Sequence, residues 1–529
     1  MRYFSELYQA LDRSTKTNEK IRALESYFRS APPVDAAWAL YFILGNTVPR
    51  PVSTRVLREW VAEAAGLPLW LLEESYAVVG DLAETFALIL RPGSGGVDVP
   101  LSRLVEETLL PLSQLEEGER KRVLFELWST LDQAQLFLVM KLITGSFRVG
   151  VQKTLLSRAL SKISGLPQAQ LAHRLMGGFA PTPAAFEKLV HPEAIESDPG
   201  QPYPFCLASP LEAPPEELGA CEDWLAEWKW DGIRAQCIRR AGQMLIWSRG
   251  EEVITETFPE IAEALSQLPS GTVVDGEIVA WDGERPLPFG ELQRRLGRKR
   301  VGAKMIEQVP THFIAYDLLE RNGTDFREAT TERRRAELET LIRDIAGHRI
   351  SISPLIQFAN WSELAQLREQ SRERRSEGCM LKRRDAPYGS GRKRGLWWKW
   401  KIDPHTCDAV LIYAERGHGR RAGLYTDYTF AVWKGEELVP IAKAYSGLTD
   451  AEFAEINRFI RDHTLTRFGP VVSLEPLLVF ELSFDDIRLS KRHKAGLALR
   501  FPRMSRIRRD KLPKDADTIE SLLALLPSL

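Results

Sequence analysis

The segment Glu227-Trp-Lys-Trp-Asp-Gly-Ile-Arg234 restricts the fold most, because it joins a strand pattern to a tight turn. Residues two apart on a strand point to one face, so Glu227 and Lys229 are expected side by side. Asp-Gly is a common turn dipeptide, and a lysine before such a turn is ordinarily a solvated charge. To act as a nucleophile, Lys229 must lose its proton, and an unperturbed lysine has a pKa near ~10.4. Partial burial, or positive charge from Arg234 or a bound metal, would lower that pKa.

Six further motifs follow this segment in order along the chain. They are Trp247-Ser-Arg249-Gly250, Val273-Val-Asp275-Gly276-Glu277-Ile278, Phe313-Ile-Ala-Tyr316-Asp317-Leu318, Glu377-Gly378-Cys-Met380-Leu-Lys382, Trp397-Trp-Lys399-Trp-Lys401 and the stretch from Leu499-Arg500-Phe501-Pro502-Arg503 to Lys511. Together with Lys229-Trp-Asp-Gly-Ile-Arg234, the set resembles the signature motifs of the covalent nucleotidyltransferases. That superfamily comprises DNA ligases, RNA ligases and mRNA capping enzymes. The last motif is similar to the C-terminal motif of ATP-dependent DNA ligases.

The resemblance implies that Lys229 attacks the α-phosphate of ATP and carries AMP as a lysyl phosphoramidate, releasing pyrophosphate. It also implies a contact from Glu227 to the adenine. Arg234 and Arg249 are expected at the ribose and phosphates, because a guanidinium donates in a planar fork and stays charged. Outside this motif context, both arginines would be interpreted as surface charges.

Two carboxylates from distant parts of the chain, Glu277 and Glu377, are expected to hold Mg²⁺ or Mn²⁺. Mg²⁺ takes few protein oxygens beside waters and substrate phosphates. Glu277 follows an apolar run typical of a buried strand, where a carboxylate needs a metal or a hydrogen bond to offset its burial. It is also a candidate for binding the ribose hydroxyls. Glu377 stands next to an arginine-rich run, so a surface ion pair is the alternative there.

Stacking on adenine requires only a flat aromatic face, and the resemblance places Tyr316 in that role. Related proteins mostly carry phenylalanine at this position, so the tyrosine hydroxyl needs a partner. An aromatic residue in an apolar strand is otherwise typical of a core. Met380 is expected on the opposite face of the base.

Lys399 and Lys401 alternate with tryptophans, a period-two pattern that puts both ammonium groups on one face of a strand. Two converging lysines suit the neutralisation of phosphates. Upstream, the triplet Arg392-Lys393-Arg394 falls where related ligases have an arginine that contacts the nucleotide. Spacing from Lys399 favours Lys393 for this contact, and a neighbouring arginine stays open.

Three regions are predicted along the chain. Residues 1–195 show apolar residues at helical spacing. Residues 205–402 mix strands and helices around the central motifs, and alternating stretches in residues 403–529 predict a small β-barrel, for which the resemblance implies an OB-fold. The expected fold class is an all-α DNA-binding domain, an α+β nucleotidyltransferase (adenylation) domain and a C-terminal OB-fold domain.

Within the helical region, the segment from Lys141 to Gly150 resembles part of the DNA-binding domain of larger ATP-dependent DNA ligases. Arg148 and Lys153 are the expected partners of backbone phosphates, beside helix N-termini and loop amides. A turn between core helices is the alternative interpretation.

The C-terminal motif supplies three further candidates for ATP binding, Arg503, Arg508 and Lys511. They belong to a different predicted domain from Lys229. They are therefore expected to swing over the pyrophosphate during the first step and then to leave.

Composition limits where and how such a chain would work. Its 529 residues exceed one ordinary domain, and a net charge of −1 does not by itself indicate a nucleic-acid binder. Basic residues are instead clustered, as phosphate binding requires. Five cysteines without Cys-x-x-Cys spacing argue against structural zinc and fit a reducing cytoplasm. With no long apolar run and no signal-peptide core, we expect a cytoplasmic, nucleoid-associated protein without membrane contact.

The sequence therefore predicts a monomeric ATP-dependent DNA ligase that seals nicks in duplex DNA through lysyl-AMP and DNA-adenylate. DNA repair, replication and recombination are the processes expected to use it. An NAD-dependent ligase shares Lys-x-Asp-Gly but usually carries a four-cysteine zinc site. RNA ligases and capping enzymes share the core, although the helical region favours DNA. A noncatalytic nick-binding protein would leave the intact nucleophile unexplained. The sequence does not identify which protein partners recruit the chain.

Overall fold

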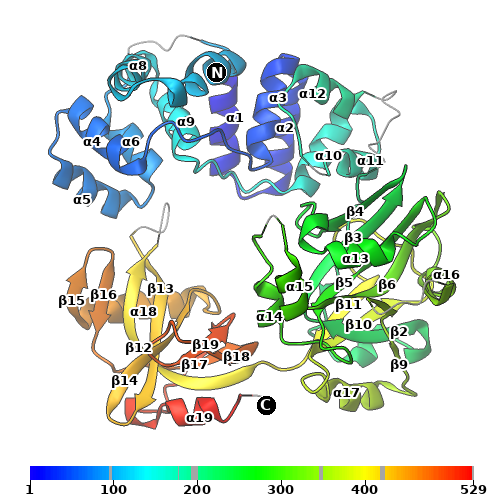
Figure 1. The fold of residues 1–529 in the computed structure, drawn as a ribbon. Helices are drawn as coiled ribbons and strands as arrows, with labels where there is room; N and C mark the ends of the chain where they lie inside the picture. Colours follow the sequence, from blue (N-terminus) through cyan, green and yellow to red (C-terminus); the bar gives the residue numbers. More distant parts are fainter. Residues whose placement is uncertain are drawn as a thin grey trace. The chain divides into compact units, whose positions relative to one another are not determined.

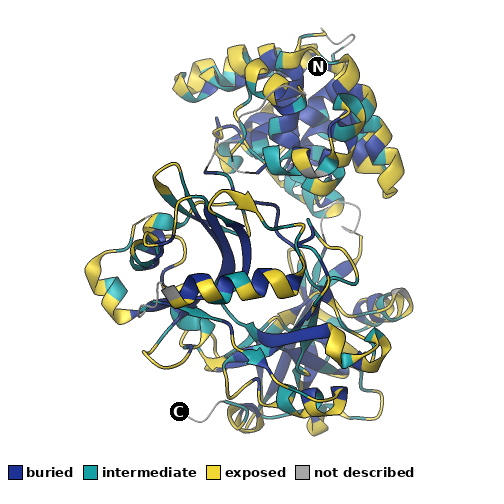
Figure 2. Cartoon of the chain, turned by 90° about the vertical axis from the view of Figure 1, so that its right-hand side faces the viewer, coloured by how far each residue is buried: buried dark blue, intermediate teal, exposed yellow. Residues whose placement is uncertain are grey.

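The computed structural model describes residues 1–93, 98–176, 178–191, 200–298, 300–344, 349–417 and 423–526 (Figure 1). The chain packs into two compact units. Met1–Gln9, Gly45–Arg148 and Asp403–Leu529 form the first unit, and Ala10–Leu44 with Val149–Ile402 form the second. Buried residues follow strands and the inner faces of helices, whereas outer helix faces are exposed (Figure 2).

The described chain up to residue 190 is helical. Its helices are α1 (Arg2–Arg13), α2 (Thr17–Ser30), α3 (Pro33–Ile43), α4 (Thr54–Ala65), α5 (Leu69–Val79), α6 (Leu82–Ile89), α7 (Leu101–Arg103), η1 (Leu104–Leu109), η2 (Pro111–Gln114), α8 (Glu117–Thr130), α9 (Gln133–Thr144), α10 (Lys153–Ser164), α11 (Gln168–Arg174) and α12 (Pro183–Val190). Across the parts of the chain that are described, no helix combines the length and apolar character needed to span a membrane.

Helix α9 shows how local sequence sets these bounds. The Asp132 side chain accepts a hydrogen bond from the Gln135 backbone N–H at 2.8 Å, in a capping box. The helix ends at Gly145, whose φ of +67° is the left-handed conformation that glycine adopts at low cost. Between these ends, the apolar residues at helical spacing are buried in the core, namely Leu136, Val139, Met140 and Ile143.

Two β-sheets organise residues 205–402, with strand orders β1-β11-β10-β2-β9 and β4-β3-β5-β6-β7, and β8 joined to β6. The strands are β1 (Ser209–Pro210), β2 (Trp224–Trp230), β3 (Ile233–Arg240), β4 (Gln243–Ser248), β5 (Thr272–Ala280), β6 (Thr311–Arg321), β7 (Thr324–Asp325), β8 (Ile350–Ile352), β9 (Leu355–Ile356), β10 (Ser376–Arg383) and β11 (Trp397–Lys401). The helices are η3 (Pro215–Leu218), η4 (Cys221–Asp223), η5 (Thr255–Thr257), α13 (Pro259–Leu265), α14 (Phe289–Gln293), α15 (Ala303–Gln308), α16 (Thr331–Asp344) and α17 (Trp361–Glu369).

Strand β2 has two chemically different faces, because side chains alternate along a strand. Trp224 and Trp228 are buried in a core with Trp361 of α17 and Trp398 of β11. Leu225 and Glu227, at the alternate positions, project to the opposite face. The alternation of indoles with charged residues thus places an apolar core behind the first sheet and the charged groups in front of it.

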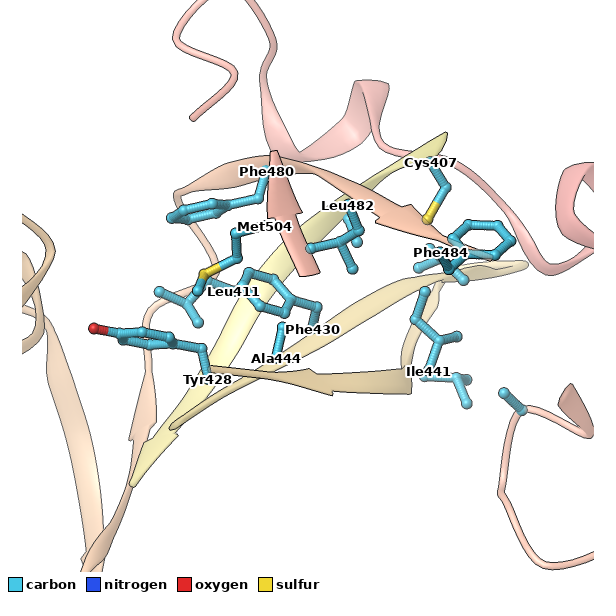
Figure 3. Close-up of a cluster of buried hydrophobic side chains, with 14 of the residues drawn as sticks. Cys407, Leu411, Tyr428, Phe430, Ile441, Ala444, Phe480, Leu482, Phe484 and Met504 are labelled. Atoms are coloured by element: carbon cyan, nitrogen blue, oxygen red, sulfur yellow. The ribbon is translucent and has the colours of Figure 1, made fainter. Parts of the chain in front are cut away.

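The C-terminal region forms curled antiparallel sheet. Its elements are β12 (His405–Arg416), β13 (Tyr425–Lys434), β14 (Glu437–Ala444), α18 (Asp450–Asp462), β15 (Thr464–Phe468), β16 (Val471–Leu474), β17 (Val479–Phe484), β18 (Asp486–Leu489), β19 (Leu497–Arg500), β20 (Arg503–Ile507), η7 (Pro513–Asp515) and α19 (Ile519–Leu523). Strand β12 pairs with β13, β16 and β17, and β20 continues from β17. Buried aromatic and aliphatic side chains fill the inside of this sheet, among them Phe430, Phe480 and Met504 (Figure 3).

The succession of an all-α region, an α+β region and an antiparallel β region confirms the predicted fold class. The expected domain bounds of 1–195, 205–402 and 403–529 stay a prediction.

Candidate active site

The register of the first sheet brings the sequence-predicted residues of three strands into one row. Met380 on β10 lies directly opposite Lys399 on β11 and Glu227 on β2. Directly paired residues project to the same face of a sheet. Lys229 and Lys401 are each two residues further along their strands, so they share that face. Met380 therefore lies between two charged residues, Lys399 and Glu227.

Lys229 and Lys401 meet at a common carboxylate. The Lys229 Nζ forms an ion pair with Glu377 Oε2, and the Lys401 Nζ lies 3.4 Å from Glu377 Oε1. The side chain of Lys229 is 22% exposed and that of Glu377 is 19% exposed, so the contact is reachable from solvent. Burial, and then the positive charges of Lys229 and Lys401, lower the pKa of Lys399. Two lysines therefore pair with one carboxylate, and a third lies close enough for their charges to act on it.

Two motif glycines are required because backbones approach closely here. A Cβ on Gly232 would lie 2.2 Å from the Ile278 carbonyl oxygen and 2.9 Å from Glu277 Cγ. A Cβ on Gly378 would lie 2.2 Å from the Trp400 carbonyl oxygen, and its φ of +136° also excludes most side chains. The first glycine lets the turn after Lys229 press against β5. The second brings the strand that carries Glu377 against β11.

The second sheet presents Arg234 and Glu277 as direct cross-strand neighbours on β3 and β5. Burial raises the pKa of Glu277 from its ordinary value of 4.5 to about 8, although the positive charges of Lys229 and Arg234 oppose the shift. The Tyr316 hydroxyl lies 3.5 Å from Glu277 Oε2, which gives that hydroxyl the partner it needs. A half-buried carboxyl with this shift is short of compensating positive charge.

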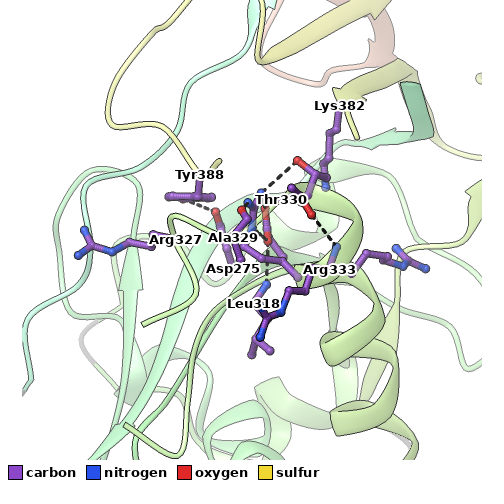
Figure 4. A network of polar contacts seen from close by, with 12 residues as sticks. Asp275, Leu318, Arg327, Ala329, Thr330, Arg333, Lys382 and Tyr388 are labelled. Atoms are coloured by element: carbon purple, nitrogen blue, oxygen red, sulfur yellow. Dashed lines mark hydrogen bonds and ion pairs between the residues drawn. The ribbon is translucent and has the colours of Figure 1, made fainter. Parts of the chain in front are cut away.

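Arg234 is tied into a buried network. Its Nη2 and Nε donate to Asp275 at 2.6 and 3.1 Å, and the guanidinium lies 5.8 Å from the centre of the Tyr316 ring. The Tyr388 hydroxyl donates to the same carboxylate at 2.6 Å (Figure 4). The structure thus gives Arg234 a protein partner in place of solvent, and its expected contact with ribose or phosphate stays a prediction.

Glu227 is also engaged by protein groups. Its Oε1 accepts a hydrogen bond from Lys382 Nζ at 2.8 Å, and both side chains are buried. Lys382, Asp275 and Tyr388 have no role predicted from the sequence. Two of them carry a signal at strand spacing, because Lys382 follows Met380 by two residues and Asp275 precedes Glu277 by two. Tyr388 stands in a loop and has no such signal.

Three other predicted residues are exposed on the surface. Arg249 directly follows β4, and its backbone N–H donates to the Arg234 carbonyl at 3.0 Å. Lys393 lies in the loop before β11, and Arg148 lies between α9 and α10. Within the described structure, none of these three side chains has a hydrogen-bonding or ion-pair partner.

Lys153 differs from Arg148, its predicted companion in DNA binding. The Lys153 Nζ forms an ion pair with Glu251, and it also donates to the Leu175 carbonyl at 3.4 Å. The charge of Lys153 is therefore already paired with a carboxylate of the protein.

The predicted residues of the C-terminal motif belong to the first unit and pair with carboxylates of the same C-terminal region. Arg503 donates to Asp485 at 2.8 Å. Arg508 and Lys511 share the buried carboxylate of Asp408, at 2.9 and 2.6 Å. The structure brings these two cations together around one acid.

Few side chains in the described structure are placed to bind a metal ion. The described residues hold no group of three or more His, Cys, Asp or Glu side chains placed to bind a metal ion. Mg²⁺ is nevertheless commonly bound by one or two carboxylates together with substrate phosphates and water. Glu277 fits such a role, because its raised pKa marks a carboxyl that additional positive charge would stabilise. Glu377 is occupied by lysines here, and its metal role stays a prediction.

Known proteins match this chain over nearly its whole length. Residues 1–161 match the family model "DNA ligase N terminus", residues 205–401 match "ATP dependent DNA ligase domain", and residues 421–511 match "ATP dependent DNA ligase C terminal region". A "Probable DNA ligase" of Koribacter versatilis is 33% identical, over 98% of this chain and 95% of that protein. A "DNA ligase" of Thermococcus fumicolans is 29% identical, over 98% and 97%.

A solved structure named Pmar-Lig_PreS3 has the same fold. It superposes with a TM-score of 0.63 over 96% of this chain and 99% of that one, at 14% sequence identity.

Proposed function

Because this chain belongs to the ATP-dependent DNA ligase family, and thus seals nicks in duplex DNA with ATP, we propose that Lys229 is its AMP carrier. In the first step, the Lys229 amine attacks the α-phosphorus of ATP. An N–P bond forms, the P–O bond to pyrophosphate breaks, and the amine releases its proton. The AMP then passes to the 5′-phosphate of the nick, and the 3′-hydroxyl attacks that phosphate and expels AMP.

The observation that carries this proposal is the pairing of Lys229 and Lys401 with Glu377, with Lys399 close enough to feel their charges. In-line displacement at phosphorus depends mainly on positioning and charge neutralisation. A phosphate that replaces the Glu377 carboxylate would meet the two ammonium groups of β11, while Lys229 stands free to attack. We assign Lys399 and Lys401 to the phosphates in all three steps.

The remaining residues divide by the part of ATP they face. Glu227 is assigned to the adenine edge, Tyr316 and Met380 to its two faces, and Arg234, Arg249 and Glu277 to the ribose and phosphates, with Lys393 as a further phosphate contact. Glu277 and Glu377 would hold Mg²⁺ or Mn²⁺, which when bound supplies further positive charge at the phosphates.

The C-terminal cations are assigned to the pyrophosphate of ATP. Arg503, Arg508 and Lys511 would act in the first step only, since the later steps contain no pyrophosphate. To act, they must exchange the carboxylates of their own sheet for phosphate oxygens. Such an exchange is suited to a gating movement.

We assign backbone phosphates of the nicked duplex to Arg148 and, after release from Glu251, to Lys153. A monomer is proposed, because one chain carries every residue that the reaction uses.

A label-transfer experiment tests the assignment of Lys229. The protein and its Lys229→Ala variant are incubated with ATP, NAD or GTP labelled in the AMP or GMP moiety. Label is expected on the wild-type protein from ATP alone, and not on the variant. Lys401→Ala, on the same sheet face, is the matched control, and it should slow labelling without moving its position. Label that survives in Lys229→Ala would overturn the assignment.

A further inference from the structure

Lys382 is a buried lysine on the sheet face that carries Glu227, Lys229, Lys399 and Lys401, which we call the adenylation pocket. Its side chain is 2% exposed, and its Nζ donates to Glu227 Oε1 at 2.8 Å and to the Tyr316 carbonyl at 2.9 Å. The Nζ also lies 4.6 Å from the ring centres of both Tyr316 and Trp397. One ammonium group therefore joins β10 to β2, β6 and β11.

A lysine this deep is costly unless its charge is paired and hydrogen-bonded. Its partners here are one carboxylate, one carbonyl and two aromatic faces, and aromatic faces attract cations. Packing alone would be served by a methionine or leucine of similar volume. The ammonium is therefore expected to serve the carboxylate that it binds.

Glu227 is held on one side only. The Arg335 Nη1 on α16 lies 3.6 Å from Oε1, the same oxygen that accepts from Lys382. Among the described residues, none donates a hydrogen bond to Oε2. Two cations thus fix the carboxylate through one oxygen, and the other oxygen is left as an acceptor for a ligand.

The position of that acceptor matches one end of a nucleotide. Glu227 precedes Lys229 by two strand residues, about 7 Å along the chain and on the same face. A nucleotide whose α-phosphorus meets the Lys229 amine can therefore place its base near Glu227. Next to Glu227 across β10 and β6 stand Met380 and the Tyr316 ring, which suit the two faces of a base.

We propose that Lys382 is a positioning residue that makes Glu227 select a 6-aminopurine. An ionised carboxylate accepts hydrogen bonds and cannot donate them. Adenine offers an N–H donor at position 6, whereas guanine offers a carbonyl oxygen there, so an aimed carboxylate attracts the first and repels the second. Lys382 aims it by fixing Oε1. The inference rests on the proposed function, in which Lys229 takes AMP from ATP.

The test compares two nucleotides and three proteins. ATP and purine riboside triphosphate differ only in the 6-amino group. Their kcat/KM values for label transfer to the enzyme are measured with the wild type, with Lys382→Met and with Arg321→Met. The last is the matched control, because Arg321 pairs with Glu337 on α16 at 2.6 Å, in a contact that does not include Glu227.

The wild type should prefer ATP by roughly tenfold to a hundredfold, the effect of one hydrogen bond to a charged group. In Lys382→Met the preference should fall below about threefold, with most of the loss in KM for ATP, and in Arg321→Met it should stay at the wild-type value. If Lys382 only supported the fold, Lys382→Met would lower kcat/KM equally for ATP and for purine riboside triphosphate. An unchanged preference in Lys382→Met would therefore overturn the inference.

Two further results separate the possible failures. If the wild type takes no label from ATP, or if Lys229→Ala still takes it, the proposed function has failed and the inference falls with it. If Lys382→Met does not fold, as thermal unfolding would show, Lys382→Arg and Lys382→Gln replace it. The preference should then decrease from lysine to arginine to glutamine. Equal preferences in all three would overturn the inference.

Discussion

The adenylation pocket and the C-terminal motif differ in how far their cations are paired with carboxylates. In the pocket, Lys229 and Lys401 share Glu377, but Lys399 has no hydrogen-bonded acidic partner among the residues that the structure describes. On the C-terminal sheet, Arg508 and Lys511 share Asp408, and Arg503 holds Asp485. Lys399 can therefore receive a phosphate directly, whereas Lys229 and Lys401 must first leave Glu377. The C-terminal cations are ion-paired with carboxylates and must exchange these for phosphate oxygens before they act.

Replacing a pocket cation should have the largest effect on activity. Lys399→Ala is expected to slow both lysine adenylation and the sealing of pre-adenylated nicks by about 10²–10³-fold, as for other charge-stabilising donors. Both rates are measured in single-turnover assays. Lys304→Ala, an exposed lysine of the same unit, is the control and should leave both rates unchanged. A loss confined to one step would contradict a shared phosphate role.

Replacing a C-terminal cation that is paired with a carboxylate should affect one reaction step only. Arg508→Ala is expected to slow adenylation by about 10²-fold and to leave the sealing of pre-adenylated nicks within about threefold, because only the first step contains pyrophosphate. Label transfer and sealing are compared on the same preparation. Equal losses in the two assays would remove the distinction between the pocket and the C-terminal motif.

The raised pKa of Glu277 predicts that stability depends on pH. The unfolded carboxyl titrates near 4.5 and the folded one at about 8, so the folded state binds more protons between these values. The free energy of unfolding should therefore fall as pH rises from 4.5 to 8, by a few kcal/mol at most. Denaturant unfolding at pH 5, 6.5 and 8 measures it. In Glu277→Gln, the free energy of unfolding should change less with pH. An equal pH dependence in the variant and the wild type would show that Glu277 is not its cause.

The smallest effects are expected at the DNA-binding surface. Arg148→Ala should weaken nicked-DNA binding several-fold and reduce the slope of log K against log salt by about one. Lys153→Ala should do less, because the ion pair with Glu251 competes with phosphate. Binding titrations at several salt concentrations measure both. A larger loss in Lys153→Ala would show that the ion pair does not hold when DNA binds.

Regular patterns made much of the fold and pocket predictable. Alternation along β11 places Lys399 and Lys401 on one face, and helical spacing identifies the buried face of α9. The motif resemblance assigns Glu377 and Lys229 to one site, and the structure joins them in an ion pair although they are distant in the chain. Strand spacing is a local property, so it can be read without knowing the tertiary fold.

What the sequence did not reveal depends on long-range pairing. The contact between Lys382 and Glu227 exists because β10 lies beside β2, and Tyr388 reaches Asp275 from a loop. Asp408 meets Arg508 only through the pairing of β12, β17 and β20. Local patterns identify each of these residues as charged or polar, and they cannot say which partner it meets.

Locating the AMP on the chain tests the central claim most directly. The wild-type protein is incubated with ATP and Mg²⁺, digested, and examined by mass spectrometry for an added AMP. We predict one modified peptide, with AMP on the side-chain nitrogen of Lys229, and no modified peptide when pyrophosphate is added to the protein before digestion. AMP attached to Lys399, Lys401 or any other residue would contradict it.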